Sequence, residues 1–319
     1  MITEIKNTIL ESYQVRKGKK KKTAFINYIE DLCNEKDIPC TVEKKGINRN
    51  IVMGASPEEC EMIVGGHYDT CARMLVPNFI TPRNGFMFIL YQILLTLLML
   101  IPGLLVSFPV AYVTDLIAPD KDLAVPAGML SYGVTTMILC AMMMVGPANK
   151  HTANDNTSGV ITVLNTMLTM TPEQRSKVCF VLFDNEEVGL LGSSAFISMH
   201  KDAKKNIPMV NLDCVSDGDY LFARLPSCHK KHDFFAKFTA AMEGSAERHG
   251  MNPRIAAKGI YPSDQMHFKQ GIGVACLNRS KLVGMYMNRI HTRRDTVFTD
   301  RNIDCLTEGL IELVGEDNA

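Results

Sequence analysis

Two long stretches without a formal charge constrain this chain more than any other feature of its sequence. Residues 84–114 and 123–149 contain no Asp, Glu, Lys or Arg, and within them lie the apolar runs Phe86–Phe108 and Leu123–Gly146. Each run is about as long as the ~20 residues with which a helix crosses a ~30 Å hydrocarbon layer. We expect a membrane-spanning helical hairpin in contact with membrane lipid. Two buried core helices, or a lid over a substrate cleft, are the alternatives.

Charges around the two runs indicate how such a hairpin is oriented. The linker of residues 115–122 is mainly acidic, whereas Arg73, Arg83 and Lys150 flank the outer ends. Because cationic flanks stay on the cytoplasmic side, we expect a two-helix, multi-pass protein of the cell membrane with the rest of the chain in the cytoplasm. Ten Cys without a Cys-x-x-Cys pair, and no opening signal peptide, favour the same reducing compartment. A net charge of zero gives no field that favours nucleic acid.

Outside the hairpin, strand patterns and helix patterns alternate along the chain. Strand patterns cover Cys40–Glu43, Asn50–Met53, Met62–Gly66, Val178–Phe183, Met209–Val215, Tyr220–Ala223 and Val274–Leu277. Helical patterns cover residues 1–35, Val160–Met170, Gly192–His200, His232–His249 and Asn302–Val314. This alternation predicts an α/β fold with a mainly parallel sheet and helices on both faces. Residues 1–83 and 147–319 would form one domain, into which residues 84–146 are inserted.

A basic segment, residues 16–22 with the sequence Arg-Lys-Gly-Lys-Lys-Lys-Lys, separates the first two helical patterns. We expect a solvated turn or helix face. Contact with anionic lipid headgroups is the alternative if the chain is membrane-bound.

An acidic turn follows the apolar strand Val178–Phe183. It begins with Asp184 and places the carboxylates of Glu186 and Glu187 side by side. Adjacent residues at a strand end point in different directions, so one can bind a metal ion while the other faces a substrate. Metal-assisted hydrolysis needs both a ligand and a separate base. A solvated acidic turn is the alternative for this segment taken alone.

Other polar residues follow strands or open helices elsewhere in the chain. They are His67 with Asp69, Asp155, Asp213 and His291. Each alone is also typical of a chance His–Asp pair, a helix cap, an acidic loop or a surface His. Because the carboxyl ends of parallel strands lie at one edge of a sheet, we expect these side chains to meet the acidic turn there. Two His and three carboxylates suit zinc or a similar divalent ion, and a shared Asp155 suits a pair of ions.

Five segments together resemble the M28 family of zinc metallopeptidases. They are Gly65–Thr70, Asn154–Gly159, Asp184–Gly189, Asn211–Asp213 and His291–Thr296, which occur in the family's order. The resemblance extends from about residue 20 to the C-terminus, apart from the insert. It implies an α/β sandwich with a mixed central sheet and two zinc ions per chain.

The resemblance also assigns ligands to the two ions. His67 and Asp213 would hold one ion, and Glu187 and His291 would hold the other. Asp155 would bridge them. The domain outside the insert would then be the catalytic domain of a metallopeptidase.

Two further residues take part in the implied reaction. Glu186 would be the general base that accepts a proton from the attacking water, and Asp69 would orient His67. The implied activity is that of an aminopeptidase that removes N-terminal residues from peptides at the cytoplasmic membrane face. A glutaminyl-cyclase-like transferase with one zinc, a catalytically inactive membrane scaffold, and a carboxypeptidase or deacetylase are the alternatives.

The sequence departs from the family in two places. The apolar insert separates Asp69 from Asp155, where members of the family have a short loop, so the hairpin should leave the fold beside the metal site. Gln265 stands where the family's Ser-Asp-His-x-x-Phe pattern has its His, and His267 lies two places later. What the usual His contributes to substrate binding or transition-state charge is therefore in question, whereas the metal ligands are intact.

Overall fold

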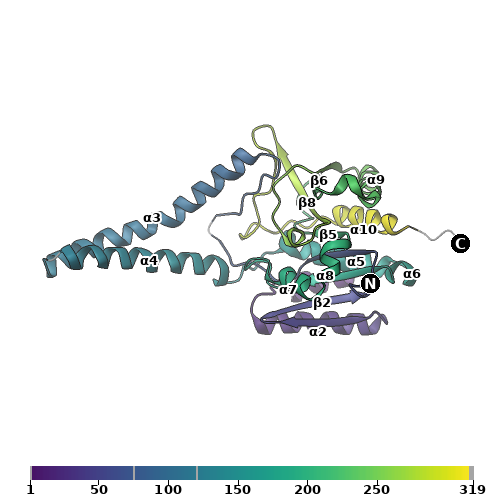
Figure 1. The fold of residues 1–319 in the computed structure, drawn as a ribbon, viewed down its shortest axis with the longest axis horizontal. Helices are drawn as coiled ribbons and strands as arrows, with labels where there is room; N and C mark the ends of the chain where they lie inside the picture. The colour runs from purple at the N-terminus through teal and green to yellow at the C-terminus, as the bar shows by residue number, and fades with distance from the viewer. Residues whose placement is uncertain (1, 75, 120, 316–319) are drawn as a thin grey trace.

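The computed structural model describes residues 2–74, 76–119 and 121–315, and one mixed sheet forms its centre (Figure 1). Asp120 of the predicted linker lies outside the described residues. The strands are β1 Cys40–Lys45, β2 Asn48–Gly54, β3 Met62–His67, β4 Val178–Phe183, β5 Met209–Leu212, β6 Tyr220–Arg224, β7 Asn252–Ala256, β8 Gly271–Ser280 and β9 Gly284–Tyr286. Their order is β1-β2-β4-β3-β5-β8-β6-β7, with β9 paired to β8.

The middle of this sheet is parallel. Strands β4, β3, β5 and β8 lie side by side in one direction, and β6 runs parallel to β7. The other neighbours are antiparallel, so the predicted mixed α/β sheet is confirmed. The strand predicted over Met209–Val215 is too long: it ends at Leu212, and Cys214 adopts a left-handed backbone with φ 58°. Edge strand β7 was not predicted, because Pro253 interrupts its pattern.

Helices cover both faces of the sheet. They are α1 Ile2–Ser12, α2 Lys19–Glu35, α5 Gly159–Thr169, α6 Pro172–Arg175, α7 Leu191–Met199, α8 Lys201–Asn206, α9 Asp233–Arg248 and α10 Asp300–Val314, with short turns at Ala153–Ser158, His229–Lys231 and Asp264–His267. Val178, Phe180 and Leu182 of β4 belong to the core cluster that contains α1, α2, α5, α9 and α10. The alternate residues of β4 belong to the cluster with α7 and α8, as the two-residue period of a strand requires.

The hairpin consists of α3 (Gly85–Ile117) and α4 (Lys121–Val145), which project away from the α/β domain (Figure 1). Both helices are long and apolar enough to cross a membrane, by length and composition. Only 6% of the most apolar window of each is buried within the chain, so they are not core helices of this domain. Gly103 lets the helices approach closely, since a Cβ there would lie 2.9 Å from the ring of Tyr132.

Arg16 is buried, which overturns the expectation of a solvated basic segment at this position. Its guanidinium donates to the backbone carbonyl of Tyr68 and, at 3.1 Å, to Oγ1 of Thr157. Burial lowers the pKa of Arg16 to about 10, so the side chain remains charged at neutral pH. Lys22 is buried as well and pairs with Asp184, whereas the lysines at 19–21 are exposed. The two buried cations therefore support the turns that follow β3 and β4.

We expect Arg16→Met to destabilise the fold by about 3 kcal/mol, because it leaves buried carbonyl groups without their charged donor. The matched variant Lys20→Met removes an exposed cation from the same segment and should change stability by less than about 0.5 kcal/mol. Thermal unfolding of the detergent-solubilised protein compares the two variants. Equal midpoints would show that the buried guanidinium is dispensable.

Candidate metal centre

Strands β3, β4 and β5 bring three polar segments to one edge of the sheet. His67 ends β3 and pairs with Phe183, the last residue of β4. The acidic turn that begins at Asp184 therefore starts beside His67. Asp213 directly follows β5, on the other side of β3. The parallel direction of the three strands is what places these groups together.

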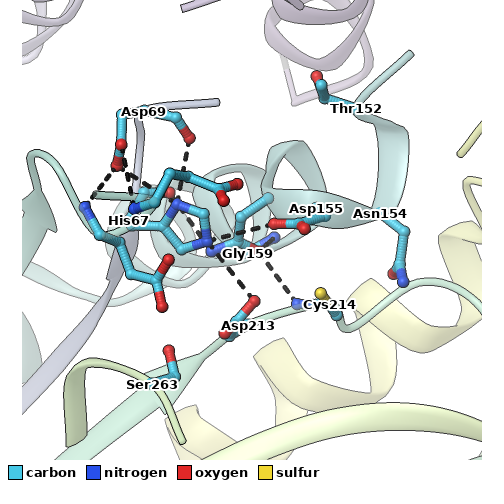
Figure 2. Close-up of polar contacts among 12 residues, drawn as sticks. His67, Asp69, Thr152, Asn154, Asp155, Gly159, Asp213, Cys214 and Ser263 are labelled. Carbon is cyan, nitrogen blue, oxygen red and sulfur yellow. Dashed lines mark hydrogen bonds and ion pairs between the residues drawn. The ribbon is translucent and has the colours of Figure 1, made fainter. Parts of the chain in front are cut away.

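The segment that carries Asp155 is attached to the ends of β3 and β5. Asn156 donates from Nδ2 to the carbonyl oxygens of His67 at 3.3 Å and Leu212 at 2.9 Å. A Cβ at Gly159 would lie 2.2 Å from the carbonyl oxygen of Leu212, so a residue without a side chain is needed at the start of α5. This attachment holds Asp155 against the strand ends (Figure 2).

The carboxylate of Asp155 lies between two imidazoles. Its Oδ1 is 3.4 Å from Nε2 of His67, and its Oδ2 is 3.0 Å from Nε2 of His291. Nε2 of His67 is also 3.6 Å from Oδ1 of Asp213, and Nε2 of His291 is 3.3 Å from Oε2 of Glu187. The five residues that the sequence predicts as ligands therefore meet in two groups that share Asp155. Figure 2 shows the group around His67.

The donor atoms of this cluster fit divalent ions. Those of His67, Asp155 and Asp213 lie within 4.8 Å of one another, and so do those of Asp155, Glu187 and His291. Oε1 of Glu187 and Oδ1 of Asp213 are buried and have no hydrogen-bond partner among the described residues. A buried carboxylate oxygen is costly unless a donor or a cation compensates it. Imidazole and carboxylate donors at this spacing suit zinc.

The pKa shifts within the cluster also favour bound divalent cations. Burial lowers the pKa of His67, but the surrounding carboxylates, led by Glu186, raise it well above its ordinary value. Burial, with the charge of Asp155, raises the pKa of Glu187 to about 8. Ionisation of every carboxyl group in the cluster is therefore unfavourable without further positive charge, which a pair of divalent cations would supply.

Asp69 connects the turn after β3 to the acidic turn. Its backbone carbonyl lies 3.1 Å from Nδ1 of His67, closer than its carboxylate Oδ1 at 3.5 Å. The carboxylate instead accepts the backbone N–H groups of Glu186 at 3.0 Å and Glu187 at 3.3 Å. Asp69 is thus in a position to orient both His67 and the adjacent acidic pair.

Asp295 has a supporting position that the sequence did not reveal. Its two carboxylate oxygens accept the backbone N–H groups of Asn154 at 2.8 Å and Asp155 at 3.0 Å. The side chain is buried, and burial together with Asp155 raises its pKa to about 8. Its signal in the sequence was its place within the family-like segment His291–Thr296, which does not identify a partner.

A cavity of about 210 Å³ opens onto the cluster, and Glu186 lines it. Part of its wall comes from residues 76–84, the strap that leads from the His67 turn into α3. Asn78 and Ile80 of the strap line the cavity, and Ile80 forms an antiparallel bridge with Met287. Tyr261 closes another side and donates from its hydroxyl to a backbone carbonyl at 2.8 Å. The strap therefore makes the hairpin's entry segment part of the site.

Gln265, which stands where the family has its usual His, supports the fold through buried hydrogen bonds. Its Nε2 donates to the carbonyl of Tyr261 at 2.7 Å, and its Oε1 accepts from Nδ2 of Asn211 at 2.9 Å. His267 lies 2.9 Å from the hydroxyl of Ser193. Neither residue lines the cavity, so His267 does not take the place of the family's usual His.

We expect Asp295→Ala to weaken zinc binding by about 10- to 100-fold, because the N–H groups that hold Asp155 lose their acceptor. Asp300→Ala removes an exposed carboxylate that pairs with Lys6 at 2.9 Å and should leave zinc binding unchanged. Competition with a chromogenic chelator measures both affinities. Equal affinities would contradict the positioning role.

Taken together, the fold and the cluster are those of a metal-dependent hydrolase. The sequence profile of peptidase family M28 matches residues 136–309, more than half of the chain, and the chain belongs to this family. The match contains Asp155, the acidic turn, Asp213 and His291, and it begins after His67 and most of the hairpin. No curated protein matches the sequence.

Solved structures share the fold at low sequence identity. The LapA aminopeptidase of Legionella pneumophila aligns with a TM-score of 0.56 and 11% identity, over 98% of this chain and 68% of that chain. LapB of the same organism has a TM-score of 0.52 and 13% identity, over 99% and 72% of the two chains. YXEP of Bacillus subtilis, a dinuclear metal binding peptidase of the M20 family, has a TM-score of 0.52 and 9% identity, over 98% of this chain and 97% of that chain. These similarities support the fold assignment alone.

Proposed function

We propose that this peptide hydrolase is a di-zinc aminopeptidase. The observation that carries the proposal is Asp155, whose two oxygens lie 3.4 and 3.0 Å from the imidazoles of His67 and His291. His67 and Asp213 would hold one ion, Glu187 and His291 the other, and Asp155 both. This arrangement favours a two-ion enzyme over a one-zinc cyclase or an inactive scaffold, because no ligand of either group is missing.

Cys71 also approaches the group of Asp155, Glu187 and His291. Burial raises the pKa of this thiol well above its ordinary value, and the neighbouring carboxylates act in the same direction. The five proposed ligands already supply three residues to each ion when Asp155 is shared, so the proposal does not require Cys71.

Glu186 is the proposed general base. Bound zinc would lower the pKa of water and polarise a carbonyl group. Burial raises the pKa of Glu186 well above its ordinary value, although His67 acts to lower it, and this makes the carboxylate a better proton acceptor. Glu186 lines the cavity, where it would accept the proton of the attacking water and donate it to the leaving amine.

We expect Glu186→Gln to lower turnover of a peptide substrate by about 100-fold or more while zinc remains bound. The matched variant Glu173→Gln changes an exposed residue of α6 and should keep full activity. Activity on a chromogenic aminoacyl substrate is measured with metal content on the same preparation. Near-normal turnover with bound zinc would reject the assignment of the base.

The reaction class is tested separately on the wild-type protein. A di-zinc aminopeptidase should contain two zinc ions per chain, cleave peptides with a free N-terminus and leave N-acetylated copies intact. A chelator should abolish the activity, and added zinc should restore it. Cleavage of the acetylated copies would favour a carboxypeptidase or deacetylase, and release of cyclised N-terminal Gln would favour the transferase.

We further propose that the hairpin spans the cell membrane and that the catalytic domain faces the cytoplasm. The length and apolar surface of α3 and α4 support the spanning, and the cationic flanks support the orientation. The active site would then open close to the membrane surface, because the strap that lines it leads directly into α3.

Accessibility tags test this topology. A reporter fused after Ala319 should be cytoplasmic, and a tag at Asp120 should be labelled only from outside the cell. Labelling of the Asp120 tag from the cytosol would reject a spanning hairpin, and it would leave the peptidase proposal unaffected.

A further inference from the structure

A second cavity, of about 760 Å³, lies where α4 meets the α/β domain, and the proposed reaction does not use it. It contacts Asp184, Asn185 and Val188 of the acidic turn, and it has no lining residue in common with the cavity beside the cluster. Besides this turn and Asp69–Thr70, three segments that are distant in sequence form its walls. They are the basic segment at 17–22, the β1–β2 turn at 44–49 and the end of α4 at 144–148.

One wall of this cavity is cationic. Lys19 and Lys44 are exposed, and among the described residues neither ammonium group has a carboxylate within 4 Å. Arg49 also lines the cavity, with its guanidinium bound to a hydroxyl and a carbonyl rather than to an acid. Lys17 donates at 2.7 Å to the carbonyl of Met144, which satisfies part of the open C-terminal end of α4.

The acidic residues of the cavity do not cancel this charge. Asp184 already pairs with Lys22 and accepts the backbone N–H of Arg49 at 3.0 Å. Asp69 accepts two backbone N–H groups of the acidic turn. Because both carboxylates are engaged on the protein side, Lys19 and Lys44 remain available for an external anion.

Another part of the lining is apolar and includes the end of the hairpin. Val145 and Ile47 are 72% and 73% exposed, although both are large hydrophobic residues. Val145 ends α4, so the cavity borders the last turn of a helix with a membrane-spanning length and composition. In a spanning hairpin this turn lies where hydrocarbon gives way to lipid headgroups.

We propose that this cavity binds the phosphate headgroup of an anionic membrane lipid. Lys19, Lys44 and Arg49 would surround the phosphate, while the acyl chains would lie along the apolar end of α4 beside Val145 and Ile47. The inference rests on the proposed membrane location of the hairpin and is independent of the peptidase reaction. The cytoplasmic leaflet, which the proposed orientation places at this height, is the anionic one.

Native mass spectrometry of the full-length protein in detergent tests the site with defined lipids. We expect phosphatidylglycerol to bind at least about tenfold more tightly than phosphatidylcholine, which shares the phosphate but carries no net charge. The double variant Lys19→Gln/Lys44→Gln should lose this preference. The double variant Lys19→Arg/Lys44→Arg should keep it. Equal binding of the two lipids to the wild-type protein would overturn the proposal.

A matched control separates the site from net charge. Lys231→Gln/Lys237→Gln also neutralises two exposed lysines, one in the short turn His229–Lys231 and one in α9, which lies away from the hairpin (Figure 1). This control should retain the preference for phosphatidylglycerol. If the control lost the lipid preference as fully as Lys19→Gln/Lys44→Gln, overall charge would explain the effect, and the proposal would be overturned.

Inorganic phosphate distinguishes a lipid site from a site for free anions. Phosphate at millimolar concentration should not displace phosphatidylglycerol, because it lacks the acyl chains that would contact α4. Displacement at that concentration would reject the lipid as the ligand.

Peptidase activity of Lys19→Gln/Lys44→Gln in detergent should equal that of the wild type, so a failure of the lipid proposal is distinguishable from a failure of the proposed function.

Discussion

The repulsion among buried carboxylates is the constraint on which the rest of this structure depends. Asp155 lies close to Asp213 in one group and to Glu187 in the other, and the supporting residues Asp69 and Asp295 are buried as well. Such an arrangement persists only if donors and cations are distributed around it. Backbone N–H groups serve the supporting acids, two imidazoles face the central ones, and unpartnered oxygens remain for metal. The ends of β3 and β5 and the segment before α5 hold these groups together.

The sequence was most informative where an apolar pattern defined a strand, or where the end of a strand defined the place of a side chain. Val178–Phe183 is a strand with the predicted bounds, because six apolar residues fill both faces of a central parallel strand. The same rule explains the site. Residues at the carboxyl ends of adjacent parallel strands must lie at one edge, so the convergence of His67, Asp213 and the acidic turn could be predicted without coordinates.

The supporting residues could not be predicted in this way. Arg16 stands among lysines in a segment that looks solvated, and only the tertiary fold places its guanidinium against the carbonyl of Tyr68. Asp295 acts through backbone N–H groups about 140 positions earlier in the chain. The local sequence pattern does not reveal partners that lie so far away in the chain. Edge strand β7 was missed for a related reason, since an exposed strand with Pro253 depends on its neighbour β6 rather than on its own pattern.

The strap has a consequence for any attempt to obtain this domain in soluble form. The segments that lead out to the hairpin and back from it lie side by side. Ala72 forms an antiparallel bridge with Ala148, and the backbone N–H of Arg73 donates to the carbonyl of Pro147 at 2.8 Å. That is the natural place to excise the hairpin with a short splice. Such a splice would also delete Asn78 and Ile80 and leave one side of the cavity beside the cluster open to bulk water. The hairpin and the cavity beside the metal-binding cluster thus share one wall, and neither can be redesigned alone.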